Sequence, residues 1–198
     1  MNIDLHHITQ IVEPKGIVHI GASTFQELEL YKSLGFKNRV WIEGNNDIPN
    51  VSAELCYYGY VGKQQEIKET WIANNNGESS SLLKPLLHLN EYPEIQFSKG
   101  SLVQVKPTSY YLDFITNITE YNYLLLDIQG MELEALKGLG KYINHFEVII
   151  TECYLAELYL NCSKLSEIEK YLINYDLLEF KQESGKSWGD AVFIKKVI

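Results

Sequence analysis

The chain has few cysteines, and they are not spaced as a disulfide framework or a zinc site. Its 198 residues include three, Cys56, Cys153 and Cys162, an odd number without C-x-x-C spacing. This usage indicates a reducing compartment. The N-terminus lacks a basic segment followed by an apolar core, and no apolar run approaches the roughly 18 to 20 residues of a membrane span. We therefore expect a cytoplasmic protein without a signal peptide or a membrane span.

Clustered positive charge is also missing. The formal net charge is −9 at pH 7, and Lys195-Lys196 is only a short pair of cations. Neutralising phosphates needs clustered Lys and Arg, so we do not expect nucleic acid as a partner. A small, uncharged or carbohydrate substrate fits the charge better. The composition, 45% hydrophobic and 22% charged, is that of an ordinary globular protein, and we expect one domain over residues 1–198.

The G-x-G-x-x-G pattern of dinucleotide-binding turns is absent as well. The apolar run ending at Ile20 is followed by Gly21, Ala22 and Ser23. A pyrophosphate would lack its glycine cradle here, which disfavours a nicotinamide-dependent oxidoreductase. A nucleoside cofactor without phosphates remains open, and S-adenosylmethionine is the common one. Taken alone, a strand followed by a glycine is more often a structural turn.

Strand-like and helix-like segments alternate along the chain. Strands are expected at 16–20, 39–43, 54–61, 66–73, 101–105, 123–127, 148–153, 177–181 and 191–194. Helices are expected at 24–34, 109–116, 131–139 and 164–174. This alternation favours an α/β sandwich with a mostly parallel central sheet. The two successive strands at the end favour an antiparallel C-terminal edge.

Three of these strands end in residues suited to ligand binding. The three segments, each a strand end with any residues that follow it, are Val18–Ser23, Val40–Glu43 and Tyr123–Glu132. Open α/β sheets bind ligands outside the carboxyl ends of their strands. Gly21 would let a ligand approach the backbone closely. Glu43, about 20 residues further on, could accept hydrogen bonds from two ribose hydroxyls; the alternative is a solvated carboxylate that opens a loop.

The order of these motifs resembles the FkbM-type family of S-adenosylmethionine-dependent methyltransferases. The likeness covers roughly residues 16 to 195 and is carried by Val18–Ala22, Trp41–Gly44, Asn76–Ser81, Leu126–Glu132, Leu136–Gly138, Thr151-Glu152 and Trp188–Phe193. Its most specific parts are D-x-Q-G-x-E, starting at Asp127, and the W-G-D-A that starts at Trp188. The resemblance implies a class I, Rossmann-like methyltransferase fold. It also implies methyl transfer to a hydroxyl oxygen, often on a sugar or a secondary metabolite.

The resemblance further implies a set of contacts to S-adenosylmethionine. The cofactor-binding candidates are His19, Gly21, Ala22, Ser23, Glu43, Gly44 and Asp127. Glu43 would hold the ribose and His19 the amino-acid end, unless His19 is a structural histidine. Many members have Asp at the position of His19 and Gly at that of Phe25. These departures keep open a second hypothesis, a binding protein that retains the fold without catalysis.

Three carboxylates are candidates for catalysis. Methyl transfer to an alcohol requires orientation and a base, and Asp127 is the first choice for that base. Alternatively Asp127 binds the cofactor or a metal, or caps the following helix. Glu152 ends a later strand, and Asp190 is expected in a turn near the C-terminus. With Asp127 they could grip a sugar's hydroxyls or a divalent cation such as Mg²⁺, although spacing alone does not support a metal site.

The remaining candidates would contact the acceptor. They are Ser79, Ser80, Ser81, Gln129, Glu132 and Trp188. The serines belong to a polar loop over 74–81, which follows a strand directly and is either ligand-facing or a linker. Trp188 could stack on a sugar face or pack in the core. Glu132 is either an acceptor contact or a surface acid in the first turn of a helix.

Overall fold

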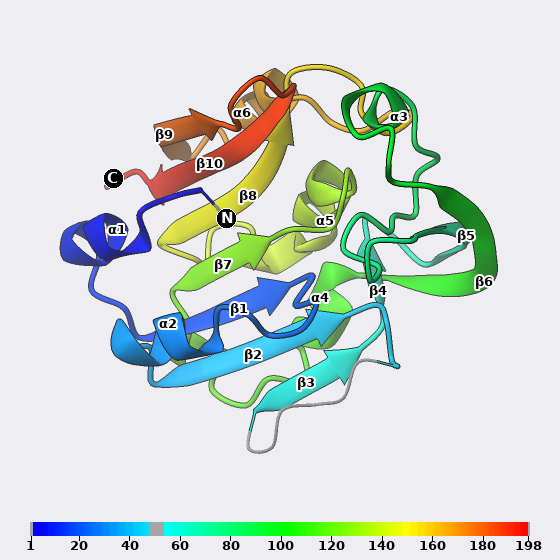
Figure 1. The fold of residues 1–198 in the computed structure, drawn as a ribbon. Helices are drawn as coiled ribbons and strands as arrows, with labels where there is room; N and C mark the ends of the chain where they lie inside the picture. The colour runs from blue at the N-terminus through cyan, green and yellow to red at the C-terminus, as the bar shows by residue number, and fades with distance from the viewer. Residues whose placement is uncertain (1, 48–53, 198) are drawn as a thin grey trace.

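The computed structural model describes residues 2–47 and 54–197. Its main sheet has seven strands in the order β3-β2-β1-β7-β8-β10-β9 (Figure 1). In chain order they are β1 (Gly16–Ile20), β2 (Asn38–Glu43), β3 (Leu55–Tyr58), β7 (Tyr123–Leu126), β8 (Val148–Tyr154), β9 (Tyr175–Gln182) and β10 (Trp188–Lys195). β10 runs antiparallel to both neighbours, and the other pairings are parallel. The predicted α/β fold with an antiparallel C-terminal strand is confirmed.

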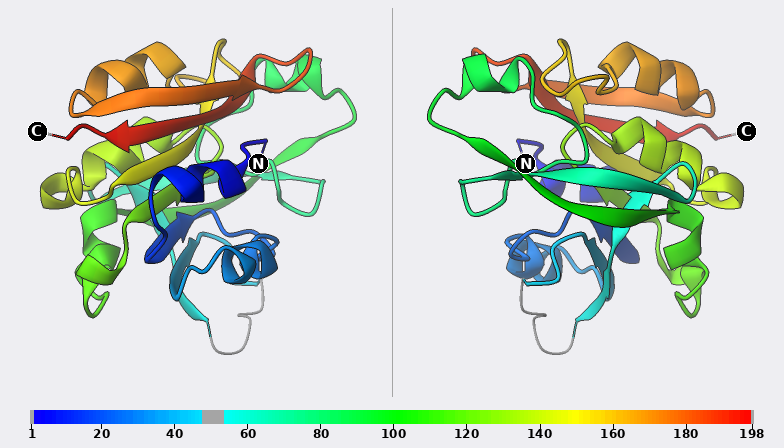
Figure 2. Two further views of the ribbon diagram at one scale, coloured as in Figure 1. Left: turned by 90° about the vertical axis from the view of Figure 1, so that its left-hand side faces the viewer. Right: turned by 90° about the vertical axis from the view of Figure 1, so that its right-hand side faces the viewer.

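Helices cover both faces of this sheet (Figure 2). One face carries α1 (Leu5–Ile11) and α2 (Leu28–Ser33). The other carries α4 (Thr108–Leu112), α5 (Glu132–Gly138) and α6 (Leu165–Tyr171), with 3-10 turns at Ile118–Glu120 and Gly140–Tyr142. Among the residues that the structure describes, no helix is long and apolar enough to cross a membrane.

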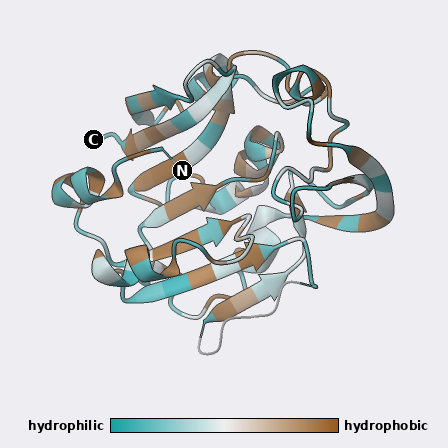
Figure 3. Cartoon of the chain, viewed as in Figure 1, coloured by the Kyte–Doolittle hydropathy of each residue, from teal (hydrophilic) through white to brown (hydrophobic). Residues whose placement is uncertain are grey.

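The central strands send alternate side chains to the two helical layers. On β7, Tyr123 and Leu125 join the core cluster that contains residues of α1 and α2. Leu124 and Leu126 join the cluster that contains residues of α4, α5 and α6. Because both faces are covered, the strand is apolar at every position. Figure 3 shows the resulting hydrophobic segments along the central strands.

A second sheet lies beside the carboxyl ends of β1, β2 and β7 (Figure 1). Its order is β4 (Tyr60–Gly62), β6 (Phe97–Pro107) and β5 (Glu66–Ala73), with α3 (His88–Glu91) in the segment that joins β5 to β6. The predicted single strand over 54–61 is wrong, because its two halves belong to different sheets. They separate at Gly59, where a Cβ would lie 1.9 Å from the Tyr111 hydroxyl oxygen.

Other differences concern the ends of elements. The helix predicted from Thr24 begins only at Leu28, because Ser23 and Phe25 have positive φ angles of 44° and 59° and a helix requires negative ones. α1 lies outside the predicted elements. Asp190, expected in a turn, lies within β10 and opposite Glu152 of β8. This strand position places Asp190 in the sheet and fixes its neighbours.

Candidate active site

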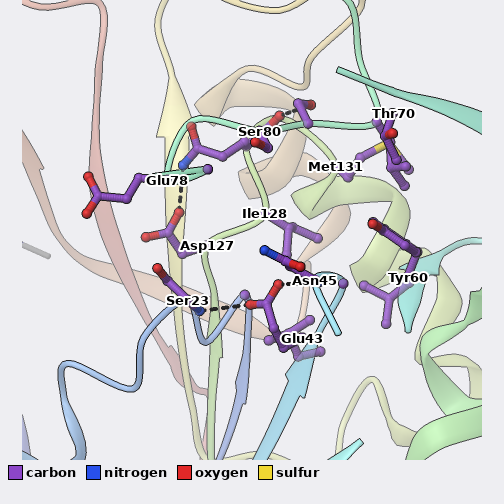
Figure 4. Close-up of a pocket in the computed structure, with 18 of the residues that line it drawn as sticks. Ser23, Glu43, Asn45, Tyr60, Thr70, Glu78, Ser80, Asp127, Ile128 and Met131 are labelled. Carbon is purple, nitrogen blue, oxygen red and sulfur yellow. Dashed lines mark hydrogen bonds between the residues drawn. The ribbon is translucent and has the colours of Figure 1, made fainter. Parts of the chain in front are cut away.

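A cavity of about 360 Å³ lies at the carboxyl ends of β1, β2 and β7 (Figure 4). Open α/β sheets bind ligands at this position, and small-molecule sites have volumes of about 300–1,000 Å³. One wall comes from the strand ends: Ile20, Gly21, Ser23, Ile42, Glu43, Gly44, Asp127, Ile128 and Gln129. The facing wall comes from the second sheet and the polar loop: Tyr60, Val61, Thr70, Ile72, Asn76, Gly77, Glu78, Ser80, Ser81 and Leu82.

Gly21, directly after β1, lies against the backbone of Asp127, directly after β7. Its φ is +89°, and a Cβ there would lie 1.8 Å from the carbonyl oxygen of Asp127. Its N–H donates to the carbonyl of Ile42 at 2.9 Å. No residue with a side chain fits this conformation and this space together. The glycine therefore lines the cavity with backbone and leaves this part of the wall without a side chain.

Glu43 is a buried carboxylate held by backbone N–H groups. Its Oε2 accepts from Ser23 N at 2.8 Å and its Oε1 from Asn45 N at 2.7 Å (Figure 4). Burial raises the pKa of Glu43, and the N–H groups of Asn45 and Ser23 oppose that shift. Each oxygen has more than one lone pair, so the carboxylate can still accept hydrogen bonds from a ligand. Next to it, Gly44 makes room for the Tyr60 ring, whose Cε1 would be 2.5 Å from a Cβ.

His19 and Ala22 do not lie on the cavity wall. Ala22 is 1% exposed and belongs to the core cluster beneath α1 and α2. The ring of His19 lies 5.0 Å from that of Trp41, and its Nδ1 is 3.1 Å from the Tyr31 hydroxyl. Burial lowers the pKa of His19 to about 4. These placements favour the structural alternative for His19 and correct the predicted cavity position of Ala22, because both side chains point into the packed face of β1.

The turn after β7 is stabilised by Glu132. This residue is fully buried, so the alternative of a surface acid is wrong. Its Oε1 accepts from the backbone N–H groups of Ile128 and Gly130, both at 3.1 Å. Burial raises the pKa of Glu132 to about 8. Glu132 is absent from the cavity lining, and the geometry places it behind the turn that carries Asp127.

Asp127 is the exposed carboxylate at the centre of the strand-end wall. Its Oδ1 accepts from Gln129 Nε2 at 2.8 Å, and the same nitrogen donates to Oε2 of Glu152 at 2.8 Å. Glu152 is buried, and burial together with the charges of Asp127 and Glu132 raises its pKa well above the usual range. The structure thus joins Asp127 and Glu152 through Gln129, and the third predicted catalytic carboxylate, Asp190, lies opposite Glu152 on the neighbouring strand β10.

A protein-family sequence model, that of the FkbM methyltransferase domain, matches residues 13–183 of the chain. The chain belongs to the FkbM methyltransferase family. This agrees with the predicted resemblance, and the matched segment contains the strand ends that form the cavity. No curated protein matches the chain.

Solved structures share the fold of this FkbM protein at low sequence identity. A ribosomal protein L11 methylase from Lactobacillus delbrueckii subsp. bulgaricus is 14% identical, with a TM-score of 0.51 over 98% of this chain and 76% of that one. TrmK from M. capricolum, in complex with S-adenosyl-homocysteine, is 10% identical, with a TM-score of 0.52 over 98% and 69%. The fold is therefore that of the class I S-adenosylmethionine-dependent methyltransferases.

The cavity of the FkbM protein has features that suit S-adenosylmethionine. The Gly21 turn leaves open backbone where a side chain would intrude, and Glu43 offers oriented oxygens for a diol. The described lining contains Glu43, Asp47, Glu78 and Asp127 but no Lys, Arg or His. A wall with this charge is suited to a sulfonium cation.

Two residues predicted for the site, Asp190 and Trp188, lie outside the cavity lining. Asp190 is buried, burial raises its pKa, and its Oδ2 accepts from the backbone N–H of Asn2. It is absent from the cavity lining, as is Trp188, whose Nε1 donates to the Tyr92 hydroxyl at 2.8 Å. Within the described ranges, no group of three or more His, Cys, Asp or Glu side chains is arranged to hold a metal.

The polar loop contributes Ser80 and Ser81 to the cavity, whereas Ser79 lies outside its lining. The loop is held by its own side chains: Ser80 Oγ accepts from Ala73 N at 3.0 Å, and Ser81 Oγ donates to the carbonyl of Gln129 at 2.6 Å. The loop over 74–81, predicted as either ligand-facing or a linker, also contributes Asn76, Gly77 and Glu78 to the lining. Sequence reasoning missed further lining residues, among them Asn45, Asp47, Tyr60, Thr70, Ile72 and Met131. No local pattern in the sequence indicated the residues of the second sheet.

Proposed function

We propose that this FkbM protein transfers a methyl group from S-adenosylmethionine to a hydroxyl of a small uncharged acceptor, with sugars as the favoured class. The observation that carries the proposal is one cavity that combines the Gly21 turn, the oriented Glu43 carboxylate and the exposed Asp127 carboxylate. The first two suit the cofactor, and the third suits removal of a proton from the acceptor.

The strand ends of β1 and β2 would hold the cofactor. Glu43 would accept from the ribose hydroxyls, and Gly21, Ser23 and Gly44 would line the path beside it. When bound, S-adenosylmethionine supplies a methyl group activated by a sulfonium. The protein then needs to orient the acceptor oxygen in line with that methyl and to exclude competing water.

Asp127 would orient the acceptor hydroxyl and take its proton. Gln129 holds one carboxylate oxygen at 2.8 Å, which limits the directions that the carboxylate can take. Ser80 and Ser81 on the facing wall offer further polar groups for an acceptor. Glu152 lies behind Gln129, away from the cavity lining, and would act through Asp127.

The charge of the cavity supports an uncharged acceptor. Four carboxylates and no cationic side chain belong to the described lining. A phosphorylated or carboxylated acceptor would be repelled by these groups and would find no cation to pair with. A neutral polyol pays no such penalty and can donate hydrogen bonds to carboxylates.

Calorimetric titration followed by an acceptor screen tests this proposal. The purified protein is titrated with S-adenosylmethionine and, separately, with NAD, and we expect binding of S-adenosylmethionine alone. Methyl transfer is then assayed with neutral sugars and their phosphate esters, with and without Mg²⁺. We expect transfer to the neutral sugars only. Binding without transfer to any acceptor would favour the non-catalytic binding protein, and lack of binding would refute the proposal.

A further inference from the structure

The side chain of Gln129 lies at the meeting point of three segments. Its Nε2 is 2.8 Å from Asp127 Oδ1 and 2.8 Å from Glu152 Oε2. Its Oε1 is 2.7 Å from the hydroxyl of Tyr159, which is also 3.0 Å from the carbonyl oxygen of Ser79. The Tyr159 hydroxyl has one proton, which it can donate to only one of these two oxygens at a time. The amide group therefore links Asp127 after β7, Glu152 on β8 and Tyr159, which lies beside the loop over 74–81.

The backbone of Gln129 is fixed as firmly as its side chain. Its φ is +52°, and that of Gly130 is +103°, both in the left-handed region. Such a conformation is costly for a residue with a side chain and persists only when its surroundings enforce it. Glu132 enforces it from within the core through the N–H groups on either side, and Ser81 bonds the Gln129 carbonyl from the cavity wall.

The orientation of the amide follows from the groups around it. An amide nitrogen donates two hydrogen bonds, and both are directed at carboxylate oxygens. The amide oxygen can only accept, and it faces the hydroxyl of Tyr159. The reverse orientation would set the amide oxygen against two carboxylates. Gln129 thus fixes Asp127 and Glu152 side by side.

The two carboxylates differ in their surroundings. Asp127 is exposed to the cavity, whereas Glu152 is 6% exposed. Burial, with the charges of Asp127 and Glu132, raises the pKa of Glu152, so the negative charge of the pair is favoured on the side that faces the cavity. Several titratable groups surround the pair. From the β1 and β2 side they are His19, Glu27, Tyr31 and Glu43. From the loop, α3, α5, β8 and β10 they are Glu78, Tyr92, Glu132, Cys153, Tyr154, Tyr159 and Asp190.

We propose that Gln129 is the positioning residue of the site, which fixes the Asp127 carboxylate at the cavity and joins it to Glu152. Ser81 holds the Gln129 carbonyl to the loop over 74–81, and the Tyr159 hydroxyl lies against the amide oxygen of Gln129. This inference rests on the proposed role of Asp127 as the base. It assigns Gln129, predicted from the sequence as an acceptor contact, to an action through Asp127. It also gives the D-x-Q-G-x-E motif a physical reason: each specified residue either belongs to this arrangement or enforces the turn that forms it.

The variant Gln129→Ala tests the proposal with two readouts. One is the titration of the Glu152 carboxyl group, followed by NMR of protein labelled with ¹³C at its Asp and Glu carboxyls. Losing a donor to the charged form should move this titration to higher pH. The other is methyl transfer as a function of pH. We expect kcat to fall by about 100-fold and the acid limb of the profile to move to higher pH, while affinity for S-adenosylmethionine changes little.

Two further variants make the result specific. Gln104→Ala removes the same group from an exposed position on β6 and should change neither readout. Tyr159→Phe keeps the buried ring and removes only the hydroxyl, so it should shift both readouts in the same direction by a smaller amount. It also tests the proposal if Gln129→Ala does not fold.

The outcomes separate this inference from the proposed function. A shifted carboxyl titration in a protein whose wild type methylates no acceptor would retain the positioning role and refute the proposed function. An unchanged titration in both Gln129→Ala and Tyr159→Phe would overturn the positioning role, whatever the activity. Loss of activity with a raised KM, an unchanged kcat and an unchanged titration would show that Gln129 contacts the acceptor instead.

Discussion

The backbone N–H of Ser23 donates to Oε2 of Glu43 at 2.8 Å and so joins the turn after β1 to the end of β2. The second oxygen of Glu43 accepts from Asn45 N at 2.7 Å. The backbone N–H groups of Ser23 and Asn45 thus hold the two oxygens of the Glu43 carboxylate in one orientation. A rigid acceptor loses little entropy when it binds a diol, which is the property expected of a ribose site.

Replacing Glu43 should therefore weaken cofactor binding. In Glu43→Ala, a diol loses its acceptor and two N–H groups lose their partner. We expect the affinity for S-adenosylmethionine to fall by about 10- to 100-fold, equivalent to about 1–3 kcal/mol, measured by calorimetry. Glu29→Ala, at an exposed position on α2, is the matched control. Equal affinity in wild type and Glu43→Ala would refute the ribose assignment.

Asp127→Asn should separate binding from turnover. The amide is nearly isosteric and keeps an oxygen that can accept from Gln129, so the fold and cofactor binding should persist. It cannot take a proton from a hydroxyl, and we expect kcat to fall by about 100-fold or more. Asp176→Asn, an exposed residue on β9, controls for the change in net charge. Substantial turnover in Asp127→Asn would remove Asp127 as the base.

The strands that carry this site could be predicted because their pattern does not depend on distant contacts. Buried parallel strands are apolar at each position, and Tyr123–Leu126 shows this directly, followed at once by the acid that faces the cavity. The same reasoning located Gly21 and Glu43. In each case a local pattern coincides with the carboxyl end of a strand, where the fold itself places ligands.

The features that were missed depend on contacts between distant residues. At the break between β3 and β4, the Tyr111 hydroxyl occupies the space that a Cβ of Gly59 would take, and the residues near Gly59 in the sequence do not indicate this contact. The burial of Glu132 follows from the need of the preceding turn for an acceptor. The hydrogen bonds that Glu132 accepts from this turn outweigh the usual preference of an acid in the first turn of a helix for solvent. Likewise, Trp188 bonds Tyr92 in a segment far away in the sequence.

Gly21→Ala should disrupt both stability and binding. The substitution places a Cβ 1.8 Å from the Asp127 carbonyl oxygen and strains a backbone at φ +89°. We expect a loss of about 3 kcal/mol in the free energy of unfolding and loss of S-adenosylmethionine binding. Gly185→Ala is a control that has the backbone strain without the steric clash. Gly185 has φ +71°, and no atom lies within 4 Å of the position that its Cβ would take. That control should cost about 1 kcal/mol. Similar costs for the two variants would contradict the close approach of β1 and β7.

The burial of Glu132 predicts a pH dependence of stability. Burial raises the pKa of Glu132 to about 8 in the folded protein, from an ordinary value of 4.5. The folded state then binds the proton more tightly than the unfolded state does, so stability decreases as the pH rises from about 4.5 to about 8. Glu132→Gln cannot ionise, and its amide oxygen can still accept from Ile128 and Gly130.

Glu132→Gln should therefore gain stability relative to wild type as the pH rises. We expect the two proteins to be similar at a pH of about 5 and the variant to be more stable by on the order of 1 kcal/mol or more at a pH of about 8.5. Urea unfolding at both pH values measures the difference, with Glu134→Gln, on the partly exposed side of α5, as control. If the difference between Glu132→Gln and wild type did not change with pH, Glu132 would ionise equally easily in the folded and the unfolded protein, and its burial would not affect its ionisation.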